Sequence, residues 1–226
     1  MQERKLKEIL DRYMNSVPEI SIHCDRCLKT ERYNGNVVLM VLDASFTSIG
    51  LNYFKSVVPK VLEFKKAFNN VKTLRDLANS NIEELKKVWR NSRSWNVAIH
   101  TAEFLSSLSS DDKSALRTWA KNSSLENWKM DPIGRIKGVG LITYQYLRMM
   151  GGVDTVMPDK IVKRVINRIL VEAGLEAVED DLEFIKVVYK IAKICNYRAI
   201  ELCWMTWLVQ YSEEQRNRYL KLLYEL

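Results

Sequence analysis

Glycine and proline are scarce in this chain, which has 8 glycines and 4 prolines among 226 residues. Few residues therefore interrupt helices, and the apolar residues recur at helical rather than alternating spacing. Long apolar runs are also missing, because the charge-free stretch at 202–212 is well short of the roughly 20 residues of a membrane-spanning helix. The charged N-terminus, MQERKLKE, lacks the apolar core of a secretory signal. We expect an all-α protein of the cytoplasm (nucleoid) or nucleus, neither secreted nor bound to a membrane.

Apolar residues make up 47% of the chain and aromatic residues 10%, which is enough for a packed core and excludes global disorder. The 35 basic residues outnumber the 28 acidic ones, and the formal net charge of +7 suits a polyanionic partner. In a reducing compartment the four cysteines would be thiols or metal ligands rather than disulfides.

The helical pattern predicts a two-lobed architecture. Residues 37–170 are expected to form a six-helix middle lobe, and residues 1–36 and 171–226 a second helical lobe built from both chain ends. Only residues 20–35 read as weakly helical, either a short strand pair or a loop. Helices are predicted at 4–13, 37–41, 51–68, 82–89, 97–108, 111–120, 142–150, 161–173, 182–193 and 198–211, with a short one beginning near Pro132.

The sharpest local feature is the segment Ile136-Lys137-Gly138-Val139-Gly140, which precedes an apolar helix. Two glycines around one apolar residue allow positive φ angles and a sharp turn, which leaves N–H groups at the helix start pointing outward. Such a turn can bind a phosphate oxygen without reading base sequence. This segment, called the hairpin below, is typical of a helix-hairpin-helix motif, and the nearby Arg135 and Lys137 are candidate phosphate partners.

An aspartate opens the next helix, 19 positions after Gly140, in the segment Met157-Pro158-Asp159-Lys160-Ile161. Arg164 and Val165 follow on the same helix. With these residues the sequence resembles the HhH-GPD superfamily of DNA glycosylases, the endonuclease III relatives, in which a Leu-Pro-Gly-Val-Gly hairpin precedes Val-Asp-Thr-His and an Arg-Val pair. Asp159 matches the catalytic aspartate, with one residue fewer in the loop. Asp154 lies too close to the hairpin to match.

The resemblance continues upstream. The segment 41–48 is similar to the Leu-Leu-Ser-Ala-Gln-Ala-Thr-Asp helix end of the family, and residues 90–93 to its Tyr-Asn-Ser-Lys helix start. The resemblance therefore spans about residues 37–170. It implies a monomer that acts on double-stranded DNA containing a damaged or mismatched base.

What the resemblance implies for Asp159 is a carboxylate beside the sugar, where it would stabilise the cation-like transition state and orient the attacking water. The plainer interpretation is a helix N-cap, and one side chain can do both. Bifunctional members carry a lysine two residues after the second hairpin glycine. This chain has Ile142 there, which cannot form a Schiff base, so the resemblance implies a monofunctional enzyme.

Further DNA contacts follow from the resemblance. Trp89 and Arg90 occupy the place of the wedge that fills the gap left by a flipped base, and Ser45 that of a polar residue facing the orphaned base. Lys163 continues the basic face beyond Asp159 and is a candidate phosphate contact. Core packing is the competing interpretation for Trp89.

No cofactor is expected. Many endonuclease III relatives hold an iron–sulfur cluster on four closely spaced C-terminal cysteines, whereas this chain has Cys195 and Cys203 alone in that half. The pair Cys24 and Cys27 has the spacing of half a zinc site, and the four thiols could meet if both chain ends share a lobe.

Two alternatives to a monofunctional glycosylase remain. One is a non-catalytic helix-hairpin-helix protein that binds DNA structure, with Asp159 only a cap. The other is a bifunctional glycosylase and abasic-site lyase that uses another lysine, such as Lys137 or Lys160.

Overall fold

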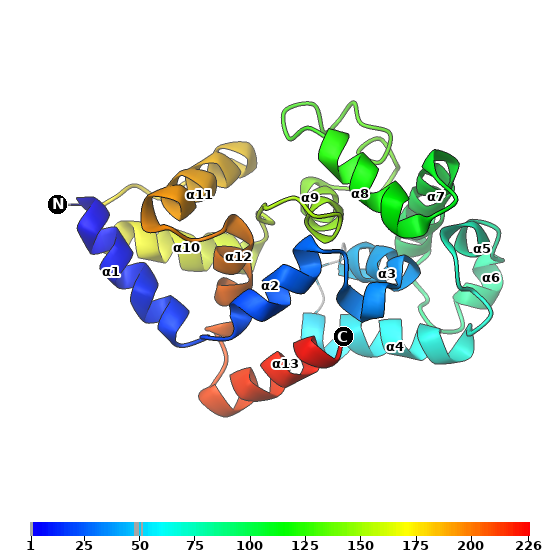
Figure 1. Ribbon diagram of the computed structural model, residues 1–226, viewed down its shortest axis with the longest axis horizontal. Coiled ribbons are helices and arrows are strands. Elements are labelled where there is room, and N and C mark those ends of the chain that lie inside the picture. The colour runs from blue at the N-terminus through cyan, green and yellow to red at the C-terminus, as the bar shows by residue number, and fades with distance from the viewer. Residues whose placement is uncertain (1, 48–49, 51) are drawn as a thin grey trace. The chain divides into compact units, whose positions relative to one another are not determined.

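A computed structural model describes residues 2–47, 50 and 52–226 of the chain (Figure 1). Over these residues the regular elements are all helical and no strand forms, which confirms the all-α prediction. None of the helices in the described part is long and apolar enough to cross a lipid bilayer. The chain divides into two compact units, residues 2–28 with 154–226 (unit 1) and residues 29–153 (unit 2).

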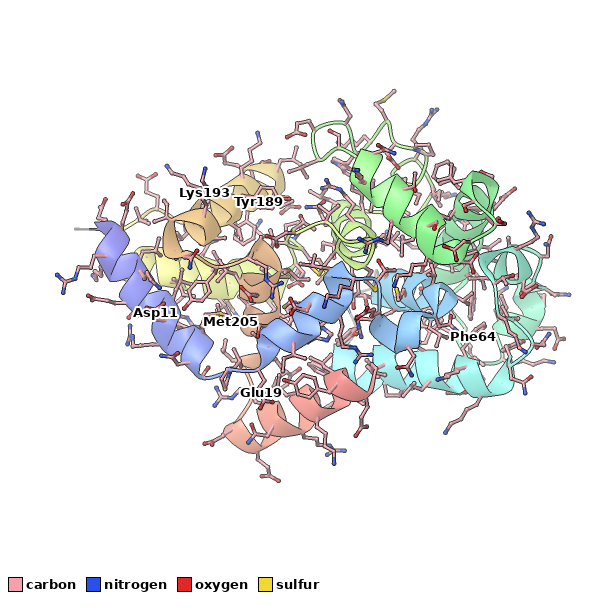
Figure 2. All side chains as sticks on the ribbon, in the orientation of Figure 1. Asp11, Glu19, Phe64, Tyr189, Lys193 and Met205 are labelled. Atoms are coloured by element: carbon pink, nitrogen blue, oxygen red, sulfur yellow. The ribbon has the colours of Figure 1, made fainter. Side chains whose placement is uncertain are left out.

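Unit 1 is built around a central helix that is apolar along nearly its whole length. In α12 every residue from Leu202 to Leu208 is buried, and the helix packs against α1, α2, α10 and α11. Met205 of this helix is labelled in Figure 2. The helices of unit 1 are α1 (Gln2–Asn15), α2 (Ile20–Leu28), α10 (Lys160–Glu172), α11 (Asp181–Cys195), α12 (Ala199–Leu208) and α13 (Glu213–Glu225).

Unit 2 likewise surrounds one buried helix, α3 (Val37–Thr47), all of whose residues are buried. It packs against α4, α5, α7, α8 and α9, and the buried ring of Phe64 on α4 belongs to the same core (Figure 2). The other elements of unit 2 are η1 (Arg32–Gly35), η2 (Tyr53–Val57), α4 (Val58–Ala67), α5 (Leu74–Ala78), α6 (Ile82–Leu85), α7 (Ser92–Leu108), α8 (Asp112–Asn122) and α9 (Leu141–Met150).

The boundaries between the units differ from the expected ones. They fall after residues 28 and 153 rather than after 36 and 170, so α10 groups with the chain ends. The reason is the apolar face of α10, on which Val162, Val165, Ile166 and Ile169 are buried where α10 packs against α1 and α12.

Residues 20–35 form neither a strand pair nor a plain loop. Ile20, Cys24 and Cys27 recur at helical spacing on the buried face of α2, and burial of that face offsets the polar residues between them. A short turn of 3-10 helix, η1, follows, in which Asn34 takes a positive φ of 56°.

The short helix expected near Pro132 is also absent, and residues 131–138 form successive turns. One helical hydrogen bond forms, from the Arg135 N–H to the Asp131 carbonyl (2.9 Å), before the chain tightens into a three-residue step from Ile136 N–H to Ile133. Gly134 explains the tightening: a Cβ there would lie 1.7 Å from the Trp128 carbonyl oxygen, so the backbone runs closer than a helix with side chains allows.

Candidate functional site

The hairpin turns at its first glycine only. Gly138 has a φ of +108°, in the region that favours glycine, and the following N–H, of Val139, donates to the Ile136 carbonyl at 2.9 Å. Gly140 has an extended φ of −108° and is the N-cap of α9. The expectation that both glycines supply positive φ angles is therefore wrong for Gly140. Gly140 has no side chain, so it leaves the N–H groups at the start of α9 without a side-chain cap.

Side chains of helix α7 donate hydrogen bonds to the backbone of the hairpin. The Arg93 guanidinium donates to the Gly138 carbonyl (3.2 Å) and the Asn96 amide donates to the Lys137 carbonyl (2.7 Å). These contacts turn two hairpin carbonyls toward α7. A hollow of about 520 Å³ lies here, lined by Ile82, Ser92, Arg93, Asn96, Lys137 and Gly138.

The start of α9 is free of side-chain capping, since Gly140 contributes no capping oxygen. Val139 is half-buried beside it, whereas Arg135 and Lys137 are exposed. Uncapped N–H groups at a helix N-terminus, next to two exposed cations, form a site that can bind an anion such as a phosphate.

Asp159 occupies the N-cap of α10 in unit 1. One carboxylate oxygen, Oδ1, accepts the backbone N–H groups of Ile161 (2.7 Å) and Val162 (2.9 Å). The other, Oδ2, accepts the indole N–H of Trp207 at 2.7 Å. Burial raises the pKa of the Asp159 carboxyl above its ordinary value of 3.8, and the three N–H donors oppose that rise. A half-buried carboxylate held this way is fixed in orientation.

No local pattern pointed to Trp207 as a partner of Asp159, because Trp207 lies 48 residues after it and resembles any other core aromatic residue. Trp207 is 6% exposed, and the centroid of its ring lies 5.8 Å from that of Trp204 on the same helix. His23 of α2 meets Trp204 edge-on at 4.4 Å. The indole that binds Asp159 is thus packed within the core of unit 1.

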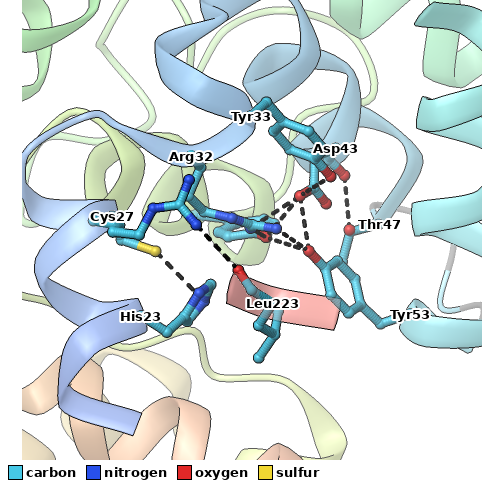
Figure 3. Close-up of polar contacts among 10 residues, drawn as sticks. His23, Cys27, Arg32, Tyr33, Asp43, Thr47, Tyr53 and Leu223 are labelled. Atoms are coloured by element: carbon cyan, nitrogen blue, oxygen red, sulfur yellow. Dashed lines mark hydrogen bonds and ion pairs between the residues drawn. The ribbon is translucent and has the colours of Figure 1, made fainter. Parts of the chain in front are cut away.

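Unit 2 contains a buried ionic cluster formed by Arg32, Tyr33, Asp43, Tyr53 and Tyr146, called the Asp43 cluster below; Figure 3 labels the first four. The Asp43 carboxylate lies 3.0 Å from the Arg32 guanidinium, and both side chains are fully buried. The same oxygen accepts three tyrosine hydroxyls at 2.8–3.1 Å. Because Tyr146 belongs to α9, the cluster fastens the helix that begins at the hairpin to α3.

Two of the expected DNA contacts lie in the core. Ser45 is completely buried and its hydroxyl donates to the Val41 carbonyl at 2.7 Å. Trp89 is 7% exposed, and its ring stacks on Phe46 at 4.7 Å. Neither side chain presents a surface to a base, so packing accounts for both. The segment 41–48 that suggested Ser45 also includes Ser48, which lies outside the described residues.

The two expected basic contacts differ from each other. Arg90 is exposed and follows directly after Trp89. Lys163 is half-buried and forms an ion pair with Asp181 (3.0 Å), besides a hydrogen bond to the Glu179 carbonyl. Its charge is therefore already used within unit 1 and is not available to a phosphate without breaking that pair.

All four cysteines are buried thiols in unit 1. Burial raises the pKa of the thiols of Cys24 and Cys203, which opposes formation of the thiolates that metals bind. Across the described residues, no three histidine, cysteine or acidic side chains come together in a way that could hold a metal ion.

Comparison with known proteins identifies the fold. No protein family and no curated protein matches the sequence. Among solved structures, the 8-oxoguanine DNA glycosylase of Thermotoga maritima matches with a TM-score of 0.58 and 15% sequence identity, over 92% of this chain and 97% of that one. The chain therefore has the all-α fold of a DNA glycosylase.

Proposed function

We propose that this protein is a base-excision DNA repair glycosylase, which flips a damaged or mismatched base out of double-stranded DNA and hydrolyses its N-glycosidic bond. The observation that carries the proposal is Asp159, a fixed and partly desolvated carboxylate at the start of α10. The fold shared with a DNA glycosylase and the uncapped hairpin in unit 2 support it.

The chemistry follows from what a carboxylate can do near a sugar. Breaking the glycosidic bond leaves positive charge on the sugar ring in the transition state, and a nearby negative charge stabilises that state more than the ground state. The same carboxylate can accept a proton from the attacking water. Uncapped amides of α9, with Lys137 and Arg135, would bind a backbone phosphate and so fix the register of the DNA.

The proposal includes a monofunctional mechanism, with water as the nucleophile. Ile142 occupies the position where the family's bifunctional members carry their lysine, and it is a half-buried apolar residue in the first turn of α9. The proposed product is an abasic site in an uncut strand. A covalent adduct trapped with borohydride would instead assign the nucleophile to a lysine such as Lys160, which is exposed beside Asp159.

Asp159→Asn tests the role of the carboxylate, and Asp180→Asn is its matched control. Asp180 caps α11 with the same geometry, its Oδ1 accepting the N–H groups of Leu182 (3.0 Å) and Glu183 (2.9 Å). Asparagine caps helices about as well as aspartate, so both variants should fold. We expect Asp159→Asn to lower the single-turnover rate at least about 100-fold and to leave DNA affinity intact, and Asp180→Asn to change neither.

The substrates for this assay are duplexes carrying 8-oxoguanine, the base named for the Thermotoga enzyme, and also alkylated purines, deaminated bases and mismatched thymine. Full activity of Asp159→Asn would refute the catalytic role. If the unaltered protein bound these duplexes but left every base in place, the alternative of a non-catalytic DNA-binding protein would replace the proposal.

A further inference from the structure

We propose that Trp207 is a positioning residue for Asp159: its indole N–H holds the second carboxylate oxygen and fixes the plane of the carboxylate for its work on the sugar. This inference rests on the proposed function and extends it to a residue on another helix. The contact that carries it is the 2.7 Å hydrogen bond from Trp207 Nε1 to Asp159 Oδ2.

The two oxygens of Asp159 have separate tasks. Capping of α10 uses Oδ1 alone, which accepts both backbone N–H groups. Asp180 caps α11 in the same way, through Oδ1 and two N–H groups. Capping at α10 is therefore complete without Trp207, and the indole acts on the oxygen that the cap does not use.

The surroundings of Trp207 keep this donor in place. Helix α12 packs against α10, and the Trp207 ring is almost fully buried beside Trp204. A large ring packed in this way cannot change rotamer without opening the core. With two amides on one oxygen and the indole on the other, rotation of the carboxylate would break at least one charge-assisted hydrogen bond.

The hydrogen bond from Trp207 stabilises the ionised form of Asp159 and lowers the pKa of its carboxyl, whereas burial raises that pKa. On α12, which packs against α10, the pKa of the Cys203 thiol responds to the charge of Asp159. Burial raises the pKa of that thiol well above its usual range, so it stays neutral while a carboxyl titrates. Removal of the indole should therefore act on Asp159 directly, without a competing charge on Cys203.

The test is a double-mutant cycle between Trp207→Phe and Asp159→Asn, read as single-turnover rates of base excision from the duplex on which the unaltered protein is active. Loss of one hydrogen bond to a charged group predicts a rate about 10- to 100-fold lower for Trp207→Phe, with DNA affinity unchanged. Because the indole acts through the carboxylate, adding Trp207→Phe to Asp159→Asn should lower the rate no further. Trp204→Phe makes the same change of side chain on the same helix and is the packing control. It should keep the single-turnover rate of the unaltered protein.

A second measurement does not depend on activity. The pKa of the Asp159 carboxyl, followed by carbon NMR on the labelled protein, should be higher in Trp207→Phe than in the unaltered protein and unchanged in Trp204→Phe. An unchanged pKa in Trp207→Phe, or rate losses that multiply in the double variant, would overturn the inference. If no base is excised from any duplex, the proposed function fails, and the NMR shift alone decides whether Trp207 holds the carboxylate.

Discussion

Asparagine in place of Asp43 should be among the most destabilising single changes in unit 2. Asp43 is the counter-charge of Arg32 at 3.0 Å, and both side chains have 0% exposure. Asparagine keeps the size of the side chain but removes its charge, which leaves a guanidinium buried without a carboxylate. Breaking a buried pair from one side costs about 3–5 kcal/mol, which is a loss of roughly two to three and a half powers of ten in the folding equilibrium.

Urea denaturation at 25 °C, followed by circular dichroism, measures this loss through the midpoint and slope of the transition. Glu63→Gln is the matched control, since Glu63 pairs with Lys60 at 2.6 Å on the surface of the same unit and is 48% exposed. The control should stay within about 1 kcal/mol of the unaltered protein.

Substitution of Arg32, the ion-pair partner of Asp43, tests independently whether the buried pair stabilises unit 2. Arg32→Met alone should also destabilise unit 2, and Arg32→Met with Asp43→Leu should cost less than the sum of the separate losses, because neither charge is then left alone. A loss below about 1 kcal/mol for Asp43→Asn, or strict additivity of the pair, would refute the view that this carboxylate and guanidinium neutralise each other.

Three further outcomes follow from the hairpin and the carboxylate. Gly138→Ala should destabilise the protein by about 1–3 kcal/mol in urea denaturation because its φ of +108° strains alanine, whereas Gly140→Ala, with open space and a φ of −108°, should cost under about 1 kcal/mol; equal costs would contradict the turn geometry. Lys137→Ala should make the negative slope of log affinity against log salt shallower by about 0.9, and Lys163→Ala, which removes an ion-paired lysine, should leave the slope unchanged; a shallower slope for Lys163→Ala alone would assign the phosphate contact to Lys163 instead. Because burial raises the pKa of Asp159, excision should fail as the pH falls through a value above 3.8, when the carboxyl gains its proton and its charge is lost; single-turnover rates that stay flat to pH 4 would contradict this.

Local sequence signals predicted the parts of the candidate site that depend on neighbours in the chain. Gly138 and Gly140 flank a single apolar residue, and that pattern alone indicates a turn into a helix. Asp159 stands before an apolar stripe of helical period, which indicates an N-cap, and its side chain does cap α10. Both features are set within a few residues of backbone, so the chain itself carries the information.

Contacts between distant segments left no such signal. The Asp43 cluster joins residues up to 114 positions apart, and an aspartate inside an apolar helix shows only that a partner must exist, not which one. Trp89 illustrates the opposite error, since its position suggested a wedge while its ring stacks on Phe46 in the core. The partners of Asp43 and the position of the Trp89 ring both depend on tertiary packing between distant segments.

The division of the chain also sets an order for its folding during synthesis. All of residues 29–153 have been made before Asp154 is added, whereas the first helix of the chain must wait for α10, α11 and α12 before its apolar face is covered. Domains generally fold as units while the chain grows. The middle of this protein can therefore reach its final packing on the ribosome, and Leu6, Ile9 and Leu10 of α1 stay uncovered until the last third of the chain emerges, so α1 needs protection from aggregation during that time.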